Sequence, residues 1–143
     1  MVDGFESLRQ DHQDASRLFA EYEASGDGSL VRELCAGLAR HAEIEEEVFY
    51  PTLRSILAEG AELADDCLNE HAAMQSLIAH IEQSPPEDLT QPIEELRALF
   101  DHHVQVEEGE ILPKMREAGI SPDALGLYLE TARQEASARH PLT

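Results

Sequence analysis

Two segments of the chain carry the same arrangement of residue types that bind metals. Residues 41–51 read HAEIEEEVFYP and residues 103–113 read HVQVEEGEILP, so each has a histidine, a glutamate four positions later and a proline six positions after the glutamate. Side chains four positions apart lie on the same face of an α-helix. Each segment therefore predicts an imidazole beside a carboxylate, and two such pairs facing each other would form a metal site.

A second pair of similar segments precedes these two. Asp11-His12 is followed five residues later by LFAEYE, and Glu70-His71 is followed five residues later by LIAHIE, at an offset of 59 residues, while Pro51 and Pro113 are 62 residues apart. The chain thus repeats a unit of one helix with an acid-histidine pair and one helix with His-x-x-x-Glu. The repeat predicts a site for two metal ions made by His12, His41, Glu45, His71, His103 and Glu107.

Histidines at helical spacing can also be ordinary core or interface residues, and for any one of them this is the simpler interpretation. Four histidines at matched positions, two with a glutamate on the same apolar stripe, are unfavourable to bury without a metal. Neutral imidazole suits divalent iron, zinc and manganese, and a carboxylate can bridge two cations. The joint pattern therefore favours metal binding.

The elements that must position these residues are predicted to be helices, because Ala, Leu and Glu dominate the composition and β-branched runs are few. Five helices are expected, over about residues 3–25, 29–59, 61–83, 90–119 and 121–138. Pro51 lacks an amide proton, so the second helix should kink or break there. Four amphipathic helices with short connections predict an all-α, up-down-up-down four-helix bundle with an additional short C-terminal helix.

Length and charge limit the remaining possibilities. The 143 residues are expected to form a single domain over residues 1–143, with the bundle core at about 3–116 and the C-terminal helix at about 121–138. Ten Lys and Arg against thirty Asp and Glu give a net charge of −20, which repels nucleic acid and anionic membranes. Without a membrane-spanning window or a signal peptide, the chain is expected to be soluble and cytoplasmic.

The fifth predicted helix has an apolar stripe at Leu125, Tyr128 and Leu129. This stripe either covers the end of the bundle or forms a contact between two copies of the chain. The sequence is compatible with a monomer and with a homodimer.

With these motifs in place, the chain resembles a hemerythrin-like domain of the HHE cation-binding family over about residues 3–116. The resemblance implies a four-helix bundle that holds two non-haem iron ions, oxo- or hydroxo-bridged when oxidised, with zinc and manganese as the alternatives. It implies terminal ligands at His12, His41, His71 and His103, and bridging ligands at Glu45 and Glu107.

The chain departs from the oxygen-carrying hemerythrins at two positions. Those proteins have a second histidine on the third helix, where this chain has Gln75. They also have His-x-x-x-x-Asp on the last helix, where this chain offers His103 or His102 before Glu107; the proline-anchored repeat selects His103. Four histidines leave more metal positions open to water, peroxide or another oxygen ligand, which favours turnover over storage.

Several other residues near the motifs have no role fixed by the sequence. Packing is the favoured interpretation for Tyr22 and Met74, and the role of Tyr50 is left open. The acids that extend beyond the predicted ligands are interpreted as solvated helix faces, namely Glu46, Glu47, Glu108 and Glu110.

Three functions remain. The leading hypothesis is a di-iron protein that reacts with peroxide or dioxygen, including catalase-like peroxide decomposition. The alternative is a protein that binds or senses dioxygen, nitric oxide or iron without turnover. The third is a bundle with a purely structural metal such as zinc, which a metal count of one or none per chain would support.

Overall fold

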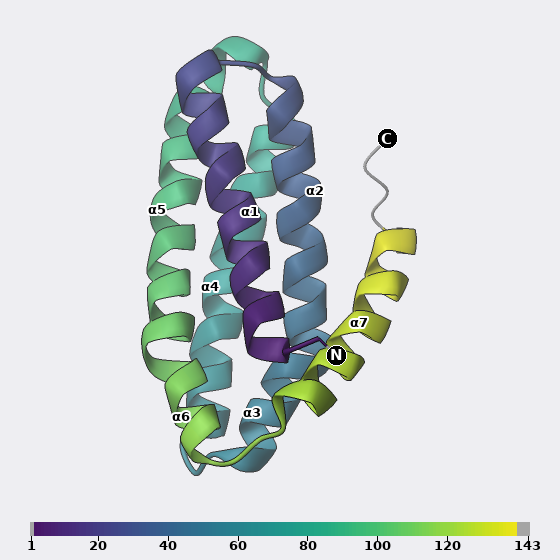
Figure 1. The fold of residues 1–143 in the computed structure, drawn as a ribbon. Helices are drawn as coiled ribbons and strands as arrows, with labels where there is room; N and C mark the ends of the chain where they lie inside the picture. Colours follow the sequence, from purple (N-terminus) through teal and green to yellow (C-terminus); the bar gives the residue numbers. More distant parts are fainter. Residues whose placement is uncertain (1, 140–143) are drawn as a thin grey trace.

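The computed structural model describes residues 2–139, which fold into helices without a strand (Figure 1). The helical elements are α1 (Gly4–Ser25), α2 (Ser29–Ile44), η1 (Glu45–Phe49), α3 (Tyr50–Ile56), α4 (Gly60–Glu82), η2 (Pro86–Asp88), α5 (Thr90–Val106), η3 (Glu107–Ile111), α6 (Leu112–Glu117) and α7 (Pro122–Arg139). The all-α prediction is confirmed. None of these helices is long and apolar enough to cross a membrane.

The long helices α1, α2, α4 and α5 lie side by side, and α7 is inclined against them (Figure 1). α1 packs against α2, α4 packs against α5, and α7 packs against both α1 and α2. This arrangement is consistent with the predicted four-helix bundle and its additional C-terminal helix.

Local sequence signals explain where the first helix begins and ends. The Asp3 carboxylate accepts a hydrogen bond from the Phe5 amide at 2.9 Å, which caps the amino end of α1. At the other end Gly26 has a φ of 69°, a left-handed conformation that glycine adopts without strain. Both ends lie within a residue of the predicted bounds.

Each repeated glutamate begins a π-helical turn, η1 or η3. In these turns the Tyr50 amide donates to the Glu45 carbonyl, and the Leu112 amide donates to the Glu107 carbonyl. Of the kink or break predicted at Pro51, the break does not occur, because η1 continues directly into α3. The wider turn moves the hydrogen-bond register by one residue and places Pro51 in the first turn of α3, where a missing N–H is tolerated.

The apolar interior forms two clusters with the histidine and glutamate residues between them. One cluster contains Phe5, Phe49 and Met115, and the other contains Phe19 and Leu96. Buried polar groups between two packed apolar clusters are held in fixed positions, because both sides resist repacking.

α7 closes the first of these clusters. Leu125 and Leu129 are buried in it, whereas Tyr128 is 64% exposed. The predicted stripe is therefore right for the two leucines and wrong for the tyrosine, since consecutive helical residues point about 100° apart. The leucines serve to cover the bundle.

Candidate metal centre

The structure brings all six predicted site residues together in the middle of the bundle. Each is more than nine-tenths buried, and the most exposed of them, His41, is 7% exposed. They come from different elements: His12 from α1, His41 from α2, Glu45 from η1, His71 from α4, His103 from α5 and Glu107 from η3. The side chain of His102, the second choice beside His103 on α5, is 66% exposed.

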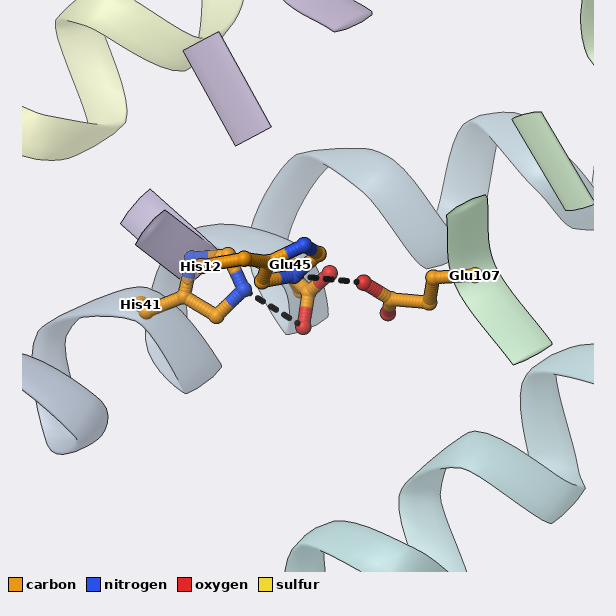
Figure 2. A group of neighbouring side chains, drawn as sticks. All are labelled: His12, His41, Glu45 and Glu107. Atoms are coloured by element: carbon orange, nitrogen blue, oxygen red, sulfur yellow. Dashed lines mark ion pairs between the residues drawn. The ribbon is translucent and has the colours of Figure 1, made fainter. Parts of the chain in front are cut away.

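The six residues form two groups that share both glutamates. His12 and His41 approach Glu45 and Glu107 on one side (Figure 2), and His71 and His103 approach the same two glutamates on the other. Within each group the potential ligand atoms lie within 4.8 Å of one another. The ring centroids are 4.9 Å apart in the first histidine pair and 4.8 Å apart in the second.

Each glutamate contacts at least one histidine of each pair, and Glu45 contacts both His71 and His103 of the second. Glu107 places Oε1 at 3.1 Å from His12 Nε2 and Oε2 at 2.9 Å from His103 Nε2. Glu45 places Oε1 at 3.2 Å from His41 Nε2 and at 3.1 Å from His71 Nε2. A carboxylate in such a position can bind one cation on each side, which is how a carboxylate bridges two metals.

Four buried polar atoms at this point make no well-aligned hydrogen bond within the described residues, although His12 Nε2 lies 3.1 Å from Glu107 Oε1 and His41 Nε2 lies 3.2 Å from Glu45 Oε1. They are His12 Nε2, His41 Nε2, Glu45 Oε2 and Glu107 Oε1. Leaving buried polar atoms unpaired is unfavourable by about 1–3 kcal/mol each, so such a cluster calls for a ligand. Donor atoms that share an ion at about 2.1 Å and at right angles lie about 3.0 Å apart, close to the spacing seen here. The residues therefore fit metal ions.

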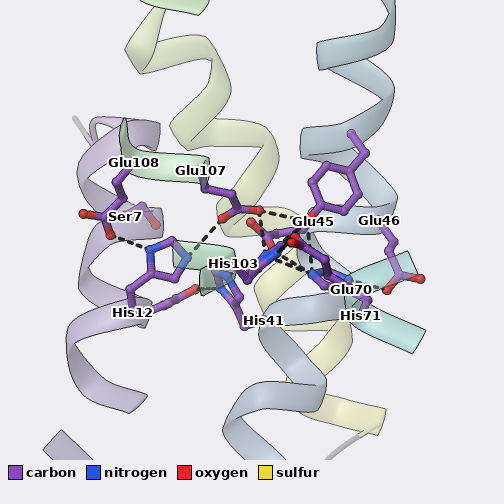
Figure 3. Close-up of polar contacts among 12 residues, drawn as sticks. Ser7, His12, His41, Glu45, Glu46, Glu70, His71, His103, Glu107 and Glu108 are labelled. Carbon is purple, nitrogen blue, oxygen red and sulfur yellow. Dashed lines mark hydrogen bonds and ion pairs between the residues drawn. The ribbon is translucent and has the colours of Figure 1, made fainter. Parts of the chain in front are cut away.

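A carboxylate on the outer side holds each of the four imidazoles (Figure 3). The distances from Nδ1 are 2.6 Å from His12 to Glu108, 2.7 Å from His41 to Asp11, 2.9 Å from His71 to Glu46 and 2.8 Å from His103 to Glu70. An ionised carboxylate only accepts hydrogen bonds, so each ring donates from Nδ1. In the neutral form Nε2 then directs a lone pair toward the centre, the tautomer that metal binding requires.

Two of these outer carboxylates, Glu46 and Glu108, were interpreted from the sequence as solvated acids; their side chains are 37% and 31% exposed, but each also holds a histidine, a contact that the interpretation missed. The sequence did contain a signal for the whole set. Asp11 and Glu70 precede matched histidines at the offset of 59 residues, and Glu46 and Glu108 follow matched glutamates at the offset of 62. The outer carboxylates thus repeat with the inner residues.

Tyr50, whose role the sequence left open, points its hydroxyl into the second group. Tyr50 Oη donates to Glu107 Oε2 at 2.8 Å and lies 3.2 Å from Glu45 Oε1 and 3.0 Å from His71 Nε2. Burial and the charges of the two glutamates raise the pKa of this phenol. Tyr50 therefore stays protonated and places a proton donor among the candidate ligands. By contrast, Tyr22 and Met74 lie in the second apolar cluster, as expected.

The buried charges shift the pKa values of the candidate ligands. Burial alone would lower the pKa of His41, but the charge of Glu45 and the hydrogen bond to Asp11 raise it to about 10. The pKa of His103 is also raised, since Glu107 and its hydrogen bonds outweigh burial. Burial would raise the pKa of Glu45, but His41 and its other partners hold it well below the usual range. Without a metal, the two imidazoles bind protons at neutral pH.

Metal binding is therefore expected to release protons. Because a metal requires neutral imidazole, two ions entering at pH 7 together displace at least two protons, one from His41 in the first group and one from His103 in the second. In the metal-free protein the raised pKa of His41 adds stability that is complete below pH 6.5, its unperturbed value, and is lost as the pH rises through about 10. Zinc titrations by calorimetry in two buffers of different ionisation enthalpy measure the released protons. A release that is absent, or that persists unchanged at pH 10, would contradict this assignment.

Two cavities reach the candidate centre from outside. One, of about 240 Å³, is lined mainly by apolar side chains such as Leu38, Met74 and Ile78, and also by His41, His71 and His103. Gln75, where an oxygen carrier has a histidine, also lines this cavity. The other, of about 500 Å³, is more polar; it includes Asp11, His41 and Arg133. The apolar cavity suits a small neutral molecule.

Comparison with known proteins agrees with this geometry. The family model described as the hemerythrin HHE cation binding domain matches residues 3–120, which include all six residues. A protein of Nostoc sp. (strain PCC 7120 / SAG 25.82 / UTEX 2576) named DNA nickase is 30% identical over 115 residues, covering 76% of this chain and 32% of that protein. The chain thus spans about a third of the length of this curated relative. No solved structure matches the chain.

Proposed function

The chain belongs to the hemerythrin HHE cation-binding domain family, and we propose that its buried histidines and glutamates hold two iron ions that react with peroxide or dioxygen. In this proposal, catalase-like decomposition of peroxide is the activity. The observation that carries it is the pair of buried groups that share Glu45 and Glu107. One site with two shared carboxylates suits a pair of ions better than a single ion.

Each residue has a definite part in the proposed site. His12, His41, His71 and His103 would be the terminal ligands, and Glu45 and Glu107 would be shared by the two ions; the two groups of possible ligands support this assignment. The outer carboxylates keep each imidazole in the binding tautomer. Iron, when bound, would supply the redox chemistry. The apolar clusters on both sides exclude water, so charges within the site interact strongly.

Tyr50 and the apolar cavity explain how a small substrate would be handled. The cavity leads to His71 and His103, and the Tyr50 hydroxyl lies 3.0 Å from His71 Nε2. A peroxide that reached these histidines would meet a phenolic proton donor in a dry environment. Positioned proton donors accelerate bond cleavage by about 10²–10⁴-fold.

The apolar lining also favours a second candidate, stable binding of dioxygen or nitric oxide without turnover. Both are small and neutral, and neither needs a proton donor in order to bind. We also propose that zinc and manganese are weaker candidates for the native metal. Residues 1–143 would act as a single domain with up-down-up-down helices; Met1 and residues 140–143 of that range lie outside the described residues.

We do not propose the activity in the Nostoc relative's name, DNA nicking, for this chain. The segment shared with this chain is about a third of that protein, and this chain carries a net charge of −20. Such a charge repels the phosphate backbone. We therefore propose a small oxygen-containing ligand, rather than nucleic acid, as the partner.

The test is peroxide decomposition by iron-loaded protein, measured as oxygen release, with the metal-free protein and an equal amount of free iron as controls. We expect turnover well above free iron. A protein with two irons and no turnover, but with a stable nitric oxide or oxygen absorption band, would support the binding function instead. A protein with one metal or none would contradict both.

A further inference from the structure

The C-terminal helix α7 is fixed firmly against the start of α1. A Cβ atom added at Gly126 would lie 1.9 Å from the Val2 carbonyl oxygen, and one added at Gly4 would lie 2.6 Å from Leu125 Cγ. Only glycine allows the two helices to approach this closely. Later in α7, Leu129 and Ala132 are buried in the first apolar cluster. The residue after Ala132 therefore has a defined position over α1.

That residue, Arg133, donates hydrogen bonds to Asp11, the outer carboxylate that holds His41. Its Nη1 donates to Asp11 Oδ1 at 2.8 Å and to Oδ2 at 2.9 Å, while Nη2 donates to the Ser7 carbonyl at 3.3 Å and to the Ser7 hydroxyl. Asp11 Oδ2 in turn accepts from His41 Nδ1 at 2.7 Å. A continuous chain of polar contacts runs from α7 through α1 to His41 on α2.

This arrangement differs between the two halves of the repeat. Glu70, the counterpart of Asp11, accepts from His103 and lies 3.3 Å from His102 Nε2, a largely exposed side chain. Within residues 2–139, neither Glu70 nor Glu46 accepts a hydrogen bond from an arginine. Glu108, the outer carboxylate of His12, has Arg9 at 4.0 Å, beyond hydrogen-bond distance. Among the outer carboxylates, Asp11 is thus the one held by hydrogen bonds from a guanidinium.

The hydrogen bonds from Arg133 affect both the orientation and the charge of the Asp11 carboxylate. A carboxylate that is fixed by a guanidinium loses its freedom to rotate toward solvent, so it holds the imidazole in one plane. The positive charge of Arg133 also offsets part of the negative charge of Asp11 and so lowers the basicity of His41, which opposes the orienting effect; the weakening expected on loss of Arg133 comes from lost orientation. Both effects act on the His12 and His41 group and not on the His71 and His103 group.

We propose that Arg133 is a positioning residue by which α7 controls one of the two metal positions, acting through Asp11 on His41. This inference rests on the proposed metal binding and extends it: the two positions are inequivalent, and retention of the ion at the His12 and His41 group depends on the docked C-terminal helix. The other position is independent of α7.

The test is a cobalt(II) titration of the full chain, followed by absorption spectra and by competition with a chelator. In Arg133→Met we expect one of the two cobalt ions to bind about 10–100-fold more weakly, the usual effect of losing an outer partner, with the other unchanged. Arg139→Ala is the matched control, because Arg139 lies on the same helix and pairs with Glu43 and Glu47 instead. It should bind both ions as the wild type does.

A double-mutant cycle tests whether Arg133 acts through Asp11. Asp11→Asn should weaken the same ion, and the double variant should be no weaker than the weaker of the two single variants, because both remove one chain of contacts. Circular dichroism melts of the metal-free variants show whether α7 docking survives. Additive losses, equal weakening of both ions, or no change in Arg133→Met would overturn the positioning role while metal binding stands. A wild type that binds no cobalt would overturn the proposed function as well.

Discussion

Replacing Glu45 with alanine is expected to remove both metal ions rather than one. Glu45 belongs to both groups of candidate ligands and is completely buried. Its loss leaves each group without one carboxylate and leaves His41 and His71 without the negative charge that offsets two cations. We expect the iron content to fall from about two ions per chain to below about one, with peroxide decomposition at the level of free iron.

Two further variants are compared with Glu45→Ala: one that should keep both ions and one that should lose a single ion. Glu110→Ala is the matched control, because Glu110 lies on the same kind of π-helical turn but faces solvent and pairs with Lys114. It should keep both ions. His71→Ala removes a residue of one group alone, so about one ion should remain. If Glu45→Ala retained two ions, the shared-carboxylate arrangement would be wrong.

Tyr50→Phe is expected to separate reactivity from metal binding. The change removes the hydroxyl that donates to Glu107 Oε2 at 2.8 Å and leaves the buried ring in place. Because Tyr50 belongs to neither of the two four-residue groups of candidate ligands, the iron content should stay at about two ions. Loss of a positioned proton donor should lower the rate of peroxide decomposition by about 10²-fold.

Tyr22→Phe is the control for this prediction, since Tyr22 lies among apolar side chains in the second cluster. It should leave the rate unchanged. Steady-state oxygen release and iron analysis on the same samples make the comparison. If Tyr50→Phe kept the full rate, the phenol would have no part in proton transfer; if it lost its iron, the hydroxyl would be needed for binding.

The sequence predicted the helices and the burial of the six residues because both follow from helical periodicity and repetition. Residues at i and i+4, such as His41 and Glu45, must share a face whatever the helices do later. The repeat then placed His12 and His71 on equivalent faces. For these residues, helix geometry and the need to bury an apolar stripe both place the side chain on the inner face of its helix.

The outer carboxylates were harder to predict because each contact crosses between helices. Glu46 follows His41 in the sequence but holds His71 on α4, and Glu108 reaches His12 on α1. Such contacts depend on how each helix is rotated against its neighbours. Charge patterning alone could not separate these acids from solvated ones such as Glu110.

The π-helical turn η1 and the buried position of Tyr50 were not predicted from the sequence. Both follow from the way the helix accommodates Pro51. Pro51 disfavours a regular turn before it, and a kink or break was expected. Instead, the extra residue of η1 absorbs the irregularity and the helix continues. Tyr50 begins the α-helix after this turn and is buried beside both glutamates. π-Helical turns often occur at functional sites, and here each begins at a candidate bridging glutamate.

The most direct test of the central claim is the amount of iron bound per chain. Protein loaded with iron(II) without oxygen, freed of excess metal and analysed by mass spectrometry against its protein concentration gives this number. Two buried groups that share Glu45 and Glu107 predict about two ions per chain. One ion per chain, or none, would contradict a two-metal centre.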